Sequence, residues 1–134
     1  MGDRITRGAA ARRDRTPSKD TRSRLMIRVA FGAHGALGPG RIRLLEMIDR
    51  HGSITAASRA MGISYRRAWL LIEGMKRAFR RPIVATQHGG TSGGGADLTS
   101  LGRDIVRRYR KIENNARGAV GRELRLLEKE LRPF

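Results

Sequence analysis

The sequence predicts a mainly α-helical domain of the α+β class, and three observations lead to this prediction. Apolar residues recur every three or four positions along most of the chain after residue 40, as they do on one face of an amphipathic helix. Gly62 separates two of these helical segments. Two short stretches, within 25–31 and 83–98, combine strand-forming residues with flanking or intervening glycines and predict small β elements.

The composition points to a polyanionic partner. The 134 residues carry a formal net charge of +17, from 29 Lys and Arg against 12 Asp and Glu. Such an excess of one sign repels itself, and nucleic acid suits it best because each neutralised phosphate releases counterions. The chain has no Cys, no run of about 18 apolar residues and no signal-peptide core. We therefore expect a cytoplasmic protein with no cofactor, no metal site and no membrane partner.

Residues 1–22 differ in composition from the rest of the chain. They hold many charges and small residues and almost nothing that a core would bury. This composition is typical of disorder, and we interpret the segment as a basic arm that adds sequence-independent affinity for nucleic acid. A solvated tail without a role is the alternative.

The first structural elements are a strand, a loop and a helix. Apolar residues alternate with others from Leu25 to Phe31, which is the period of a half-buried strand. The glycine-rich stretch 32–40 should follow it as a loop. An amphipathic helix is then expected from Arg41 to His51, with Gly52 as its C-terminal stop.

The next stretch, Thr55 to Trp69, has the pattern of two helices joined by a tight turn. Thr55 and Ser64 are natural N-caps, because their hydroxyl groups accept hydrogen bonds from free backbone N–H groups. Gly62 tolerates the positive φ that such a turn needs, and the apolar Ile63 holds the turn against a core. A helix-turn-helix, whose second helix lies in the DNA major groove, fits this pattern; an ordinary αα-hairpin fits it too.

The second helix is expected to run from about residue 65 to residue 80, since Pro82 cannot continue it. Four residues at helical spacing should face the core: Ala68, Ile72, Met75 and Phe79. The large surface of Trp69 favours a core position over an interface. The residues expected in the major groove are Ser64, Tyr65, Arg66, Arg67 and Leu70, with Arg66 or Arg67 able to bond guanine. Phosphate contacts are expected from Ser53, Thr55, Lys76 and Arg77.

After Pro82, residues 83–87 and 96–98 predict two short strands joined by a glycine-rich segment. These glycines do not form a nucleotide-binding P-loop, because no Lys-Ser or Lys-Thr follows them. A β-hairpin directly after a recognition helix is the wing of a winged helix-turn-helix. We expect the wing to contact phosphates or the minor groove through Thr91, Ser92 and Gly93, and an unstructured linker is the alternative.

Thr99 should cap a further helix, whose continuity Gly118 and Gly121 weaken by roughly 1 kcal/mol each relative to Ala. We therefore divide the chain into a DNA-binding domain, 23–117, and a C-terminal helix, 118–134. The apolar face of this region needs a partner, and a second subunit is preferred over packing within the chain. The expected dimer contacts are Ile105, Tyr109, Ile112, Val120, Leu124, Leu127 and Leu131.

Several segments resemble one known family. They are Leu37–Gly40, Leu44–Glu46, Gly52–Ser58, Met61–Trp69 and the glycine-rich stretch that ends at Leu98-Thr99. Together they look like the N-terminal DNA-binding domain of ModE, the bacterial molybdate-responsive regulator, and more distantly like the LysR-type winged helix-turn-helix. The resemblance covers roughly residues 25–117. Its most specific part is the run from Ser64 to Trp69 together with the glycine-rich wing.

The resemblance implies a homodimer that places two recognition helices on a palindromic DNA site. The family carries molybdate-binding domains after the DNA-binding domain, whereas this sequence ends at Phe134. We therefore expect a stand-alone DNA-binding member, and we do not expect it to bind molybdate.

These observations predict a sequence-specific transcriptional regulator that binds duplex DNA as a homodimer in the bacterial nucleoid. The alternative is an architectural protein that coats DNA with little sequence preference, which the high net charge would also suit. RNA binding is less favoured, because only 4% of the residues are aromatic and few can stack on unpaired bases. No nucleophile or acid–base pair lies in a pattern that indicates an enzyme.

Overall fold

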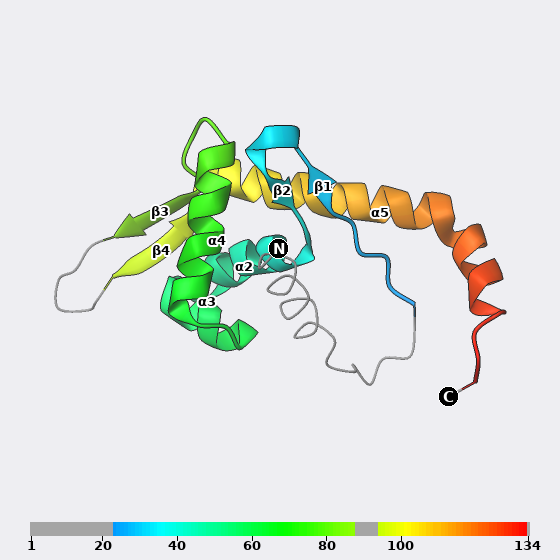
Figure 1. Cartoon of the computed structure of the whole chain (residues 1–134). Coiled ribbons are helices and arrows are strands. Elements are labelled where there is room, and N and C mark those ends of the chain that lie inside the picture. The colour runs from blue at the N-terminus through cyan, green and yellow to red at the C-terminus, as the bar shows by residue number, and fades with distance from the viewer. Residues whose placement is uncertain (1–22, 88–93, 134) are drawn as a thin grey trace, which may run out of the picture.

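A computed structural model describes residues 23–87 and 94–133 of the chain (Figure 1). Helices and two small antiparallel sheets make up these residues, which confirms the predicted α+β class. In chain order the elements are β1 (Val29–Ala30), the 3-10 helix η1 (Gly32–His34), β2 (Ala36–Leu37), α2 (Pro39–His51), α3 (Ile54–Met61), α4 (Tyr65–Ala78), β3 (Val84–Gln87), β4 (Gly95–Leu98) and α5 (Ser100–Glu128).

The predicted first strand is shorter than expected. The alternation of burial holds from Leu25 to Ala30, but only Val29 and Ala30 pair, and they do so with β2 inside the stretch predicted to be a loop. Gly32 and Gly35 have φ angles of 61° and 91°, which let the chain reverse between the two strands. Helix α2 starts two residues earlier than predicted because Pro39 suits the first helical position, where no N–H is needed.

Tyr109 holds the N-terminal segment against α5. Its hydroxyl donates a 2.6 Å hydrogen bond to the backbone oxygen of Ile27, and its side chain is only 1% exposed. Burial raises the pKa of this phenol, with the nearby carboxylate of Glu113 as the second cause. The contact joins two parts of the chain that lie far apart in the sequence.

Helix α2 lies at the centre of the domain. Four of its side chains are fully buried: Ile42, Leu44, Leu45 and Ile48. Gly52 ends the helix as predicted, with a φ of 71° and its N–H bonded to the oxygen of Ile48 at 2.8 Å. The oxygen of Gly52 in turn accepts a 2.8 Å bond from the N–H of Ala96, so this one turn connects α2 to β4.

The predicted pair of strands forms directly after α4. Strands β3 and β4 are antiparallel, with Val84 opposite Leu98 and Gln87 opposite Gly95. Ile83, Ala96 and Leu98 are buried against the core. Thr99 then caps α5 as predicted, because its hydroxyl oxygen accepts from the N–H of Gly102 at 3.1 Å.

Helix α5 is one continuous helix of 29 residues (Figure 1). The segment predicted as a separate element from residue 118 is its C-terminal part, up to Glu128. Adding residues to an existing helix is favourable, so a cost of about 1 kcal/mol at each of Gly118 and Gly121 does not interrupt it. The C-terminal part bends and extends away from the other elements (Figure 1). Among the described residues, no helix is long and apolar enough to cross a membrane.

Arg110 joins the middle of α5 to α2 through Glu46 and also pairs with a carboxylate of its own helix. Its guanidinium bonds Glu46 on α2, with the Nε–Oε2 distance at 3.1 Å, and Glu113 one turn further along α5 at 2.6 Å. Glu113 is only 7% exposed, and Arg110 is its ion-pair partner. The hydrogen bond to Glu46 is the main reason that the pKa of Arg110 is raised.

Candidate nucleic-acid interface

The N-cap of helix α3 lies two residues before the predicted cap, and the helix begins at Ile54. The oxygen of the Ser53 hydroxyl accepts a 2.9 Å bond from the N–H of Ala56, so Ser53 is the N-cap. Thr55 was predicted to be this cap, and that prediction is wrong because Thr55 already lies in the first turn. Its backbone oxygen accepts a 2.8 Å bond from the hydroxyl of Ser58, which is buried.

The turn between α3 and α4 has the predicted chemistry. Gly62 has a φ of 68°, and its N–H donates to the oxygen of Arg59 at 3.1 Å. Ile63 packs partly buried against the core, and its N–H reaches the oxygen of Ser58 at 3.0 Å. Ser64 caps α4, as its hydroxyl oxygen accepts from the N–H of Arg67 at 3.1 Å. These bonds fix the angle between α3 and α4.

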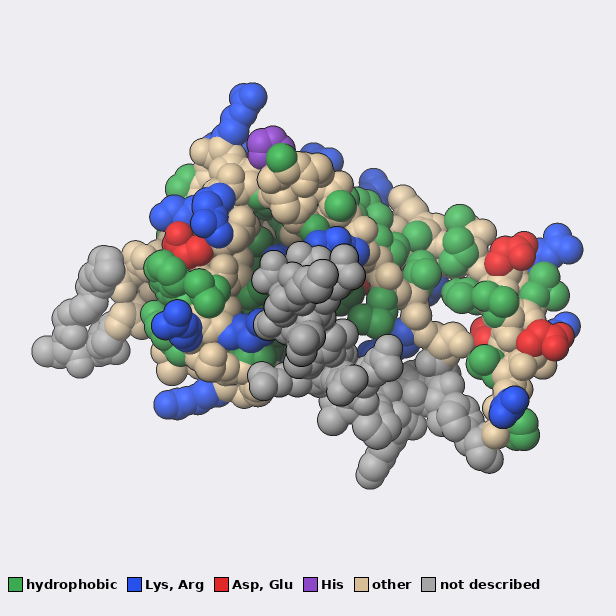
Figure 2. All heavy atoms as spheres, viewed as in Figure 1, with side chains coloured by type: hydrophobic (Ala, Val, Ile, Leu, Met, Phe, Trp, Pro, Cys, Tyr) green, Lys and Arg blue, Asp and Glu red, His purple; other side chains and the backbone are tan. Residues whose placement is uncertain are grey.

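Helix α4 has one buried face and one exposed face. Ala68, Ile72 and Met75 are buried and Phe79 is partly buried, as predicted. Tyr65 and Leu70 are exposed, also as predicted, and they are joined on the surface by Trp69. Hydrophobic and basic side chains lie next to one another over this helix (Figure 2).

The predicted core position of Trp69 is wrong, because its side chain is 46% exposed. The core side of α4 is filled by residues spaced four and three apart, starting from Ala68, and Trp69 lies about 100° further round the helix. Its spacing of four from Tyr65 places both aromatic rings on the exposed face. Helical spacing was therefore the better guide to this residue than its size.

The first turn of α4 carries two arginines and no carboxylate. Arg66 and Arg67 are both exposed at the N-terminal end of the helix. This end has partial positive charge, so cations there are unfavourable for the isolated helix and an anion is favourable. The other charged residues of the helix are further along, where Glu73 pairs with Lys76 at 3.9 Å.

The remaining residues predicted to contact DNA differ in how exposed their side chains are. Ser53 is half-buried and its hydroxyl is occupied as a cap, whereas Thr55, Lys76 and Arg77 are exposed. Thr91, Ser92 and Gly93 lie outside the described residues. At the ends of the strands next to them, Thr86, Gln87 and Gly94 are exposed.

The residues predicted as dimer contacts separate into two groups. Ile105 and Tyr109 are buried in the core of their own chain, so they present no surface to a second subunit. Ile112, Leu127 and Leu131 are exposed on or just beyond α5, the last two by 65% and 64%. Val120 and Leu124 lie between Ile112 and Leu127 along the helix and are half-buried.

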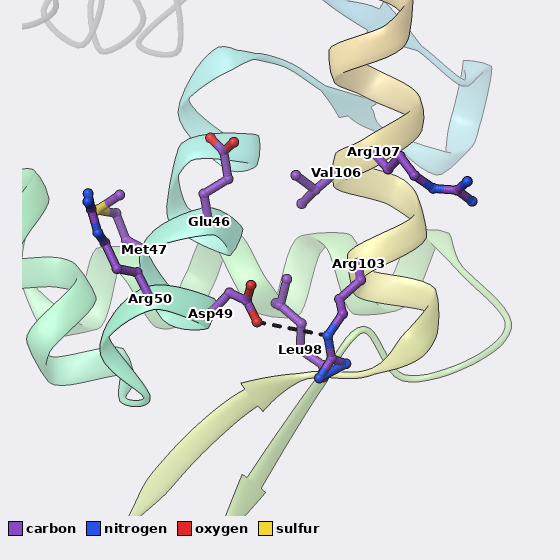
Figure 3. A pocket seen from close by; sticks show the side chains of 8 residues that line it. All are labelled: Glu46, Met47, Asp49, Arg50, Leu98, Arg103, Val106 and Arg107. Carbon is purple, nitrogen blue, oxygen red and sulfur yellow. Dashed lines mark hydrogen bonds and ion pairs between the residues drawn. The ribbon is translucent and has the colours of Figure 1, made fainter.

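A hollow of about 560 Å³ lies between α2, β4 and α5 (Figure 3). Met47, Leu98 and Val106 give it an apolar part, and charged side chains of both signs surround this part. Arg103 approaches Asp49 at 4.0 Å and also donates to the oxygen of Leu98 at 2.8 Å. Because its charges are largely balanced within the chain, this hollow is a poor site for a polyanion.

No group of three or more potential metal ligands comes together within the described part of the chain. The arrangement that stands out is therefore the exposed face of α4, with its first-turn arginines, two aromatic rings and a leucine.

The sequence is similar to known bacterial proteins. It is 44% identical over 87 residues to the molybdenum transport protein ModE of Azotobacter vinelandii, across 65% of this chain and 32% of that protein. It is 38% identical over 92 residues to the molybdenum-pterin-binding protein MopA of Rhodobacter capsulatus, across 69% and 33% of the two chains. It is 39% identical over 71 residues to the DNA-binding transcriptional dual regulator ModE of Escherichia coli K12, across 53% and 27%.

The chain spans about a third of the length of these curated relatives. No family model matches the sequence. The similarity supports the relation to ModE that the sequence motifs indicate. The three relatives carry the names of a transport protein, a molybdenum-pterin-binding protein and a transcriptional regulator, in agreement with the prediction that this chain is not an enzyme.

Proposed function

We propose that this chain is the DNA-binding part of a sequence-specific transcriptional regulator of the ModE type, with a winged helix-turn-helix fold distantly like that of LysR-type proteins. In this proposal α3 and α4 are the helix-turn-helix, the β3–β4 pair is the wing, and α4 enters the major groove. Two copies bind a palindromic operator in the bacterial cytoplasm. Binding of molybdate forms no part of the function proposed for these residues.

The observation that carries this proposal is the N-terminal turn of α4. Its two arginines lie at the positive end of the helix dipole without a carboxylate beside them. An anionic partner would relieve the repulsion between these charges and the dipole. The exposed apolar side chains of Tyr65, Trp69 and Leu70 suit contact with thymine methyl groups, and an arginine can bond guanine O6 and N7 together. Arginines and exposed apolar side chains therefore lie together within the first two turns of α4.

The position of α4 in the chain, shortly before the two strands, also supports the proposal. The end of α4 leads within a few residues into β3, and Thr99 bonds the oxygen of Pro82 at 2.7 Å on the way into α5. A helix followed directly by an antiparallel strand pair puts both elements within reach of one duplex.

The test is to select bound sequences from a random pool of duplexes and to compare affinity for the selected site with affinity for random DNA. A regulator is expected to prefer its site by at least about 10³ at physiological salt. Arg66→Ala should cost about 1–3 kcal/mol on the selected site and relax the base preference at one position.

Arg43→Ala is the matched control, because Arg43 is an exposed arginine on α2 and its substitution removes the same charge. An affinity ratio near unity for the wild-type protein would contradict sequence-specific binding and favour the architectural role instead. An unchanged base preference in the Arg66 variant would remove α4 from the proposed reading surface.

A further inference from the structure

Two adjoining hollows beside α4 are lined by basic side chains and by no carboxylate among the described residues. The first has a volume of about 270 Å³, and its charged residues are Arg28, Arg41 and Arg67. The second has a volume of about 370 Å³ and is lined by Arg41, Arg77 and His34. Arg41 lines both hollows, and we refer to the two together as the Arg41 groove.

The positive charge of the Arg41 groove is not balanced within the described chain. Its four arginines make no ion pair there, whereas Arg103 and Arg110 each have a carboxylate partner. Partial burial lowers the pKa of Arg41, and the charges of Arg28 and Arg67 lower it further. The guanidinium groups of Arg28 and Arg67 therefore repel that of Arg41 across the first hollow.

The backbone adds to this field. Helix α2 starts in the groove with Gly38 as a cap that has no side chain, so no side-chain oxygen accepts from the first N–H groups. Pro39 has no N–H, and those of Gly40 and Arg41 have no acceptor among the described residues. A Cβ built at Gly38 or Gly40 would meet nothing within 4 Å, which shows that the space beside this turn is open.

The length of the groove suits an extended anion better than a single ion. Arg67 and Arg77 are ten positions apart on α4, about 15 Å along the helix at 1.5 Å per residue. One strand of DNA presents a phosphate every 3.4 Å along the duplex axis, so more than one phosphate can pass a groove of this length. The first hollow alone has room for several water molecules of about 30 Å³ each, and so for a phosphate group that keeps part of its hydration.

We propose that the Arg41 groove binds backbone phosphates of the DNA strand next to the major groove that α4 enters. Arg28 and Arg67 hold one phosphate with Arg41, and Arg77 and Arg41 hold the next. This inference rests on the proposed function and refines it, since it assigns Arg67 to the backbone and leaves base reading to Arg66. The chemistry recognised is a phosphate group, which a free phosphate ion also provides.

The test compares Arg41→Gln with Arg43→Gln, which remove the same charge from the same helix; Arg41 is half-buried and lines the groove, whereas Arg43 is exposed and lines a different hollow. Affinity for the selected site and for random DNA is measured over a range of salt concentrations. Arg41→Gln should weaken both and reduce the slope of log affinity against log salt by about 0.9, the value for the loss of one charge that neutralises a phosphate, while Arg43→Gln leaves the slope unchanged. Arg67→Gln should behave like Arg41→Gln.

Equal slopes for the two α2 variants, or a loss of base preference in Arg41→Gln with no change of slope, would overturn the proposal. Thermal unfolding shows whether each variant folds, and Arg41→Lys, which keeps the charge, should retain most of the slope. In a second experiment, inorganic phosphate is titrated into the protein while NMR follows the amide signals of Gly40 and Arg41. If the wild-type protein does not bind DNA, the proposed function fails. Phosphate-induced shifts that are lost in Arg41→Gln would then still support the site, and their absence would refute it.

Discussion

Several side chains of this protein are buried or exposed in a way that their residue types do not predict. Trp69 belongs to a type that usually contributes large buried area, yet it lies on the exposed face of α4 because the small Ala68 occupies the position that faces the core. Tyr109 shows the reverse, since it was expected at a subunit interface and is fully buried in its own chain. In both cases the position of the residue around its helix decides whether the side chain is buried or exposed.

At this scale we predict the effect of Tyr109→Phe. The change removes the 2.6 Å bond to the oxygen of Ile27 and keeps the packing of the ring, so stability should fall by about 0.5–1.5 kcal/mol. Urea unfolding measures this change, and hydrogen exchange at residues 27–30 should become faster. Unchanged exchange would show that other contacts hold the N-terminal segment against α5.

At the scale of elements, the caps and close contacts determine where helices begin and how they pack. Ser53, Ser64 and Thr99 each cap a helix through a side-chain oxygen. Gly102 follows the last of these caps and packs against the strand pair, because the backbone oxygen of Ile83 lies where its Cβ would be. This contact brings α5 directly onto the residue that precedes β3.

Gly102→Ala should therefore destabilise the fold by about 1–3 kcal/mol, since the added methyl group forces backbone apart. Gly118→Ala is the matched control in the same helix. A Cβ there meets nothing, so this change should stabilise the protein by as much as about 1 kcal/mol through helix propensity. Chemical denaturation of the two variants measures both effects, and opposite signs are the expected result. Equal effects would mean that the contact with Ile83 is not tight.

At the scale of the whole molecule, charge and apolar surface are unevenly distributed. Carboxylates pair with arginines where α2 meets α5, which leaves the positive charge beside α4 unbalanced within the described chain. The C-terminal part of α5 extends from the domain with Leu126 and Leu127 exposed, and Leu131 follows it (Figure 1). The proposed dimer would cover these leucines, because one helix alone cannot bury them.

Leu127→Glu with Leu131→Glu should therefore shift the protein from dimer to monomer. Sedimentation equilibrium measures the dissociation constant, which should rise at least about tenfold, equivalent to 1.4 kcal/mol. Leu70→Glu adds a similar charge in place of an exposed leucine on α4 and should leave the dimer intact. A wild-type protein that sediments as a monomer at high concentration would contradict the proposed dimer.

The sequence by itself determined the local structure of this protein. Gly52 and Gly62 adopt the positive φ expected of them, Ser64 and Thr99 cap their helices, and the spacing of Ala68, Ile72 and Met75 places the buried face of α4. These features depend on residues a few positions apart, which helix periodicity and capping chemistry describe well.

Only the tertiary structure decided which residues meet across the chain. Arg28, Arg41 and Arg67 come from three separate segments, so no sequence spacing indicates that they line one hollow. The bond from Tyr109 to Ile27 spans 82 positions, and β2 forms only because β1 lies beside it. Contacts of this kind depend on how α2, α4 and α5 pack, and packing is set by the whole core and not by any one segment.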